Sequence, residues 1–128
     1  MKLGKSGYDW QEMWLLKYFF KVPVLFPELK TYLKTVSSNR NKHSINRATA
    51  LLILGRFGDY ADLRLIKDMF GTEESLYIKR AIILALQRLP KGERNHAYKY
   101  WASQDISLYL AVEYVNQKEE LVDVQGAS

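Results

Sequence analysis

The chain has 128 residues, a net charge of +5 and no cysteine, and 26% of its residues are charged. This length suits one domain with its own hydrophobic core, and the lack of cysteine excludes disulfides, thiolate metal sites and thiol nucleophiles. The first residues lack the apolar core of a signal peptide, and no apolar run is long enough to span a bilayer, so we expect a cytoplasmic protein.

Apolar residues recur at helical spacing along the chain, and no stretch shows the sustained alternation of a strand. Glycine and proline fall mostly between the apolar segments, where they punctuate structure. The pattern predicts helices at roughly 9–20, 27–36, 44–57, 60–70, 74–89, 93–102 and 106–117. Because the connections are short, consecutive helices should pack as antiparallel neighbours.

The first predicted helix is crowded with aromatic residues. Trp10, Trp14 and Tyr18 are spaced by four and share one helical face. Such a face buries a large apolar area against the next helix. The alternative is a protein interface, because aromatic residues are enriched at the centres of interfaces.

Helix start signals support the next boundaries. Pro27 suits a first helical position, and Asp59 followed by Asp62 suits an N-terminal cap. Thr72, with Glu73 and Glu74 after it, predicts the following helix start, because negative charge is favoured in a first turn.

Basic residues dominate the segment from Leu29 to Gly58, which contains no acidic residue. Such a segment attracts phosphate backbones or an acidic protein face. The alternative is structural, since Arg56 and Arg88 lie near predicted helix C-termini, where carbonyls favour a cation. The candidate partner-binding residues are Lys34, Arg40, Lys42, Arg47, Arg56, Lys79, Arg80 and Arg88.

A repeated pattern lies in the second half of the chain. The triplet at 75–77 recurs at 107–109, and the same offset superposes Leu52 on Leu84 and Arg56 on Arg88. A period of roughly 32 residues that contains two helices is typical of an α-solenoid unit, because one helical pair cannot cover its own apolar face.

The segments INRATALLILGRFGD and YIKRAIILALQRLP each resemble the second helix of a HEAT repeat, and LRLIKDMFGTEES resembles the first helix with its acidic turn. The resemblance covers about 26–117 and is clearest at 60–89. The last unit departs from it, because Ala111 and Val112 stand where basic residues would be.

The resemblance implies an all-α fold, an α-α superhelix or HEAT-like solenoid of about three helical pairs after an N-terminal helix. It implies repeats at 26–58, 59–90 and 91–117, and the residues outside them predict a flexible end at 1–7, a helix at 8–25 and a tail at 118–128. It also implies that the second helices line a concave side, with Arg47 and Lys79 in one column and Arg56 and Arg88 in another. The sequence leaves open whether the chain is a whole protein or an excised domain.

Other motifs carry little chemistry. Gly4-Lys5-Ser6 lacks the strand and earlier glycine of a phosphate-binding loop. His43 and His96 lack metal-ligand spacing. We therefore predict no cofactor, no metal site and no catalytic residue.

These observations predict a non-catalytic binding or scaffold module that contacts nucleic acid or an acidic protein. One alternative is a module that binds only protein. The least favoured is a HEAT-like DNA glycosylase using Trp101 and Asp105, since such an enzyme needs an acid beside aromatics in a cleft. A faint resemblance of Tyr8-Asp9-Trp10-Gln11 and Trp14-Leu15-Leu16 to the accessory tails of bacterial reverse transcriptases would make it an accessory domain. The oligomeric state is not predicted.

Overall fold

The computed structural model describes residues 12–13, 16–17 and 27–127, with side chains as far as 119. All regular structure in these residues is helical, which confirms the all-α prediction. The α-helices between 27 and 127 are α2 (Pro27–Ser38), α3 (Ser44–Phe57), α4 (Tyr60–Met69), α5 (Leu76–Ala85), α6 (Lys91–Ala102) and α7 (Ile106–Ala127). Two short 3-10 helices, η1 (Phe70–Thr72) and η2 (Leu86–Arg88), follow α4 and α5.

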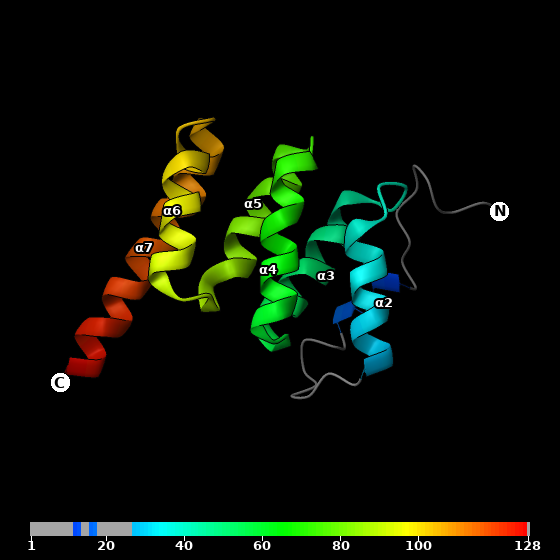
Figure 1. The fold of residues 1–128 in the computed structure, drawn as a ribbon, viewed down its shortest axis with the longest axis horizontal. Coiled ribbons are helices and arrows are strands. Elements are labelled where there is room, and N and C mark those ends of the chain that lie inside the picture. The colour runs from blue at the N-terminus through cyan, green and yellow to red at the C-terminus, as the bar shows by residue number, and fades with distance from the viewer. Residues whose placement is uncertain (1–11, 14–15, 18–26, 128) are drawn as a thin grey trace.

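The helices form two layers that run along the long axis of the molecule (Figure 1). Helices α2, α4 and α6 lie nearer the viewer, and α3, α5 and α7 lie behind them. Helix α3 packs against α2 and α5, α5 packs against α7, and α7 packs against α6. The second helix of each consecutive pair therefore contributes to one shared layer, α3/α5/α7.

Helix α5 lies at the centre of the core. Ile78, Ile82 and Ile83 are completely buried, and Lys79 and Arg80 are the polar residues of this helix. A helix that is apolar around most of its circumference must be covered on most sides. The packing of α5 between α3 and α7 provides this cover.

A close backbone contact sets the distance between α3 and the end of α5. A Cβ atom added to Gly55 would lie 2.3 Å from the carbonyl oxygen of Ala85. Only glycine allows the two backbones to approach this closely without a displacement. Gly55 is therefore required by packing, although its helical position would otherwise favour alanine.

Two predicted helix starts are confirmed. Helix α2 begins at Pro27. At α4, Asp59 and Asp62 form a reciprocal capping box, in which each side chain accepts a hydrogen bond from the backbone N–H of the other residue. This arrangement satisfies two of the backbone donors that a helix N-terminus leaves free.

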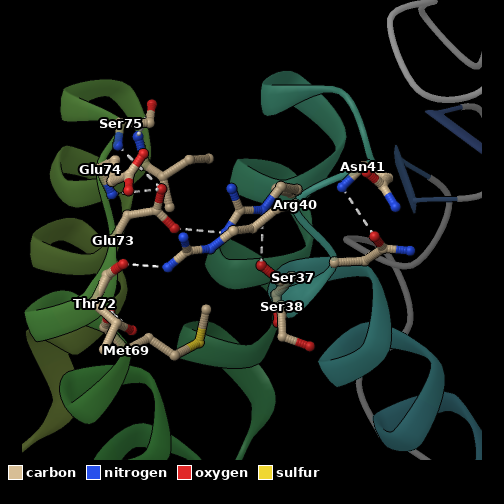
Figure 2. Close-up of polar contacts among 12 residues, drawn as sticks. Ser37, Ser38, Arg40, Asn41, Met69, Thr72, Glu73, Glu74 and Ser75 are labelled. Carbon is tan, nitrogen blue, oxygen red and sulfur yellow. Dashed lines mark hydrogen bonds and ion pairs between the residues drawn. The ribbon is translucent and has the colours of Figure 1, made fainter.

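The start of α5 differs from the prediction (Figure 2). Thr72 belongs to η1, and Ser75 rather than Thr72 caps α5, with its Oγ accepting from the N–H of Ile78. The Glu73 carboxylate accepts from the N–H groups of Glu74 and Ser75. These hydrogen bonds hold an extended turn before the helix, so Glu73 and Glu74 do not form its first turn.

The last helix is longer than the sequence predicted. Helix α7 extends to Ala127, beyond the predicted end at 117, because the glutamate, lysine and glutamine residues that suggested a tail are also good helix formers. At the other end, 12–13 and 16–17 are helical. The interface residues predicted at Trp10, Trp14 and Tyr18 lie outside the described residues.

In the described part of the chain, no helix has both the length and the apolar character that a membrane span requires.

Candidate functional site

A hollow of about 430 Å³ opens on the α3/α5/α7 layer. Its walls come from α3, from α5 with η2, and from α7. Of the described residues, three cations line it and no acidic residue does. The lining residues are Leu52, Gly55, Arg56, Leu84, Ala85, Gln87, Arg88 and Lys118.

A second hollow, of about 500 Å³, lies between α5 and α7 and shares Leu84 with the first. Its lining is mostly apolar, and no acidic residue contributes to it in the part of the chain whose side chains are described. The lining residues are Arg80, Leu84, Ile106, Ser107, Leu110, Ala111 and Tyr114. Because Leu84 lines both hollows, we treat the two as one candidate site.

Three exposed cations, one from each helix of the layer, line this site. We call Arg56 of α3, Arg80 of α5 and Lys118 of α7 the basic face. Each lies near an aromatic ring of its own helix, at 5.2, 5.7 and 5.8 Å from the ring centroid, respectively. Among the described residues, no carboxylate pairs with any of the three.

Arg88 lines the first hollow but also has a structural role. Its Nη1 donates to the carbonyl oxygens of Gly55 and Gly58, at 3.0 and 2.8 Å. These carbonyls lie at the C-terminal end of α3, where backbone acceptors lack helical partners. Arg88, which follows α5 in the next helical pair, therefore caps the C-terminal end of α3.

Arg47, another predicted binding residue, is buried. Its Nη2 lies 2.6 Å from Oε1 of Glu73, and its Nε donates to the carbonyl oxygen of Ser37. Burial alone would raise the pKa of Glu73, but the hydrogen bonds from Arg47 and the Ser75 N–H outweigh burial and lower it. Arg47 thus joins the end of α2 to the turn before α5.

Lys34 pairs with an acid from a neighbouring helix. Its Nζ lies 2.8 Å from Asp62 Oδ1, and Lys30 Nζ lies 3.0 Å from Asp62 Oδ2. Burial alone would raise the pKa of Asp62, but hydrogen bonds from Lys34, the Asp59 N–H and Lys30 outweigh burial and lower the pKa to about 2. This cluster ties α2 to the capping box of α4.

Lys42 and Arg40 also make contacts within the fold. Lys42 Nζ lies 2.9 Å from Oε2 of the buried Glu12, which accepts from Tyr32 and Asn46 as well. The guanidinium of Arg40 donates to the carbonyl oxygen of Thr72 (Figure 2). Cations of the acid-free segment at 29–58 therefore pair with carboxylates and carbonyl oxygens of segments that are distant in sequence.

Lys79, the partner of Arg47 in the predicted column, lies in a different environment. It is half-buried, with Nζ 5.2 Å from the centroid of the Phe70 ring. By contrast, Arg56 and Arg88 of the other predicted column line one hollow. Lys118 was not predicted as a site residue, because it lies in the segment that was expected to be a tail. The high helix propensity of that segment is the signal that could have identified it.

The glycosylase candidates Trp101 and Asp105 lie in structural positions. Trp101 is buried and stacks on Phe70 with ring centroids 3.9 Å apart. Asp105 accepts from the N–H of Ser107 at the start of α7. Neither lines the two hollows, nor a third of about 530 Å³ between α6 and α7.

In the part of the chain that the structure describes, no three residues of the histidine, aspartate or glutamate type lie close enough together to hold a metal ion. His43 instead accepts from the N–H of Ile45 at the start of α3, and His96 is exposed on α6. The described residues therefore do not form a metal centre.

The chain is similar to a deoxyhypusine hydroxylase from Debaryomyces hansenii. The two are 32% identical over 82 residues, which cover 64% of this chain and 26% of the hydroxylase. The matched region is thus about a quarter of the length of that curated relative. No protein-family model matches the chain, and no solved structure matches it.

This similarity corrects the prediction of function. A non-catalytic binding or scaffold module was expected, with no enzymatic activity, whereas the relative is named as an enzyme. The prediction was wrong because it relied on the columns of cations and on the spacing of apolar residues. These patterns indicate which residues are exposed and how helices pack, but they do not indicate what reaction a larger protein catalyses. The resemblance to reverse-transcriptase accessory regions gains no support from the comparisons.

Proposed function

We propose that this chain is a HEAT-like helical-repeat part of an enzyme related to deoxyhypusine hydroxylase, and that its basic face holds an acidic substrate protein. The similarity to the hydroxylase supports the enzymatic part. The packing of consecutive helical pairs supports the repeat. The observation that carries the binding role is that Arg56, Arg80 and Lys118 lie on one layer with no carboxylate paired to them among the described residues.

The arrangement of charges favours a protein over a nucleic acid as the partner. Affinity for duplex DNA comes largely from lysine and arginine side chains that neutralise several phosphates at once. Here Lys34, Arg47 and Arg88 use their charges inside the fold. The three cations of the basic face line hollows that also contain apolar residues such as Leu84, and this combination suits a protein surface better than a phosphate backbone.

Binding of labelled poly-L-glutamate and of a labelled DNA duplex, each measured at several salt concentrations, tests the binding role. We expect poly-L-glutamate to bind, and we expect Arg56→Glu with Arg80→Glu to weaken it by about tenfold or more. The matched control is Lys67→Glu with Lys99→Glu, which makes the same charge change on α4 and α6. Equal loss in both variants, or preference for the duplex, would overturn the proposed role.

The enzymatic part needs its own measurement. The enzyme that contains this chain is incubated with a deoxyhypusine-containing protein, dioxygen and an electron donor, and mass spectrometry follows the gain of one oxygen atom while the second oxygen leaves as water. Oxygen gain that slows in the Arg56→Glu, Arg80→Glu variant is the expected result. No oxygen gain with the unsubstituted protein would remove this reaction while leaving the binding measurement intact.

A further inference from the structure

Helix α7 exposes an apolar stripe toward the second hollow. Ile106, Leu110 and Tyr114 are 69%, 60% and 54% exposed and all line that hollow. They are spaced by four residues, so they lie on one side of the helix. We call these three residues the apolar stripe.

The stripe faces a helix that completes a groove. Leu84 of α5 forms the opposite wall, and Arg80 lies at the same hollow. Lys118 follows Tyr114 on α7 and lies 5.8 Å from its ring. Along α7 the stripe spans roughly 12 Å, which matches about two turns of a docked helix.

Single exposed apolar residues are ordinary on protein surfaces, whereas grouped ones mark interaction sites. Leu65 on α4 and Tyr100 on α6 are similarly exposed, but they line neither hollow of the α3/α5/α7 layer. The stripe differs from them because it joins an apolar groove flanked by cations that have no carboxylate partner among the described residues. A single bound partner therefore needs both an apolar face for the stripe and acidic groups for the cations.

We infer that the groove between α5 and α7 binds an acidic amphipathic helix of a partner protein. Its apolar face packs on the apolar stripe and Leu84, and its carboxylates meet Arg80, Arg56 and Lys118. Charge complementarity selects this occupant, because a basic or neutral helix would leave three desolvated cations unpaired. This inference rests on the proposed function and specifies the partner as a helical segment with apolar anchors.

A set of labelled peptides tests this inference. The first, of about 16 residues, is rich in glutamate and places leucines on one helical face. The second is a scrambled sequence of identical composition that spreads its leucines around the helix, and the third probe is poly-L-glutamate. We expect the first peptide to bind at least about tenfold more tightly than the other two.

The protein variants use a matched pair of leucines. Leu110→Ser should weaken binding of the first peptide by about tenfold, whereas Leu65→Ser, at a similarly exposed leucine on α4, should leave it unchanged. Tyr114→Ser gives a second test if Leu110→Ser loses its helical circular dichroism.

Three outcomes overturn the inference. Equal binding of all three acidic probes would leave the basic face of the proposed function standing but remove the groove. Binding of no probe would remove both. Self-association of the unsubstituted protein that Leu110→Ser abolishes would assign the groove to a second copy of the chain.

Discussion

The guanidinium of Arg47 and the carboxylate of Glu73 form a buried ion pair, with 2.6 Å between Nη2 and Oε1. Their side chains are 6% and 5% exposed. The pair connects α3 with the turn that precedes α5, and Arg47 also reaches the carbonyl oxygen of Ser37 at the end of α2. Three segments of the chain are thus held by one guanidinium.

Removing one member of this pair should be costly. Arg47→Met leaves the buried carboxylate of Glu73 without its cation, so we expect the free energy of unfolding to fall by about 3–5 kcal/mol. Urea unfolding followed by circular dichroism measures the change. The double variant Arg47→Met, Glu73→Gln should lose less than Arg47→Met alone, because no buried charge is left uncompensated. A double variant that loses more would contradict the role of the ion pair.

Gly55 tests the close contact between α3 and the end of α5. Gly55→Ala places a Cβ atom 2.3 Å from the Ala85 carbonyl oxygen, so the helices must separate. We expect a loss of about 1–3 kcal/mol in thermal or urea unfolding. Gly92→Ala is the control, since no atom lies within 4 Å of its added Cβ, and it should be neutral or stabilising. Equal effects at the two glycines would argue against the close contact.

Arg88 and Arg56 line one hollow but should respond differently to substitution. Arg88→Met leaves the Gly55 and Gly58 carbonyls without their donor, so we expect stability to fall by about 1–3 kcal/mol. Arg56→Met removes an exposed side chain and should change stability by less than about 0.5 kcal/mol. Unfolding curves of both variants provide the comparison. A stability loss at Arg56 equal to that at Arg88 would show that Arg56 is structural as well.

Asp62 predicts how stability depends on pH. Its pKa is lowered from 3.8 to about 2, so its contribution is fully present above about pH 4 and is lost as the pH falls through the folded-state value. We expect a loss on the order of 2 kcal/mol across this window. Urea unfolding at successive pH values should show a smaller loss in Asp62→Asn. Asp68→Asn, at an exposed carboxylate of the same helix, should retain the full loss.

Local sequence signals were sufficient for most helix positions. The spacing of apolar residues predicted α3 at 44–57, as observed, and Asp59 with Asp62 predicted the start of α4. Such signals work because helical periodicity and capping are decided within a few residues. The start of α5 was missed because the Glu73 carboxylate bonds to the backbone of its own turn and to Arg47, and the latter lies far away in sequence.

The candidate site was predictable only in part. Arg56 and Arg80 were named from the sequence and are exposed on the layer that the HEAT resemblance implied. Arg47 and Lys34 have the same charge in the sequence, yet they pair with Glu73 and Asp62. A charge count along the chain cannot distinguish the two groups, because the acids that neutralise a cation come from other helices.

The sequence by itself determined that this chain is helical, where most of its helices begin, and that apolar α5 must be covered on most sides. Tertiary structure alone decided which cations remain available, because burial and ion pairing depend on the residues that packing brings together. The tertiary structure also decided that Leu84 lines both hollows and that the apolar stripe of α7 lies beside α5. The physical reason is that helix formation is mainly local, whereas a binding surface is made from side chains that are distant in sequence.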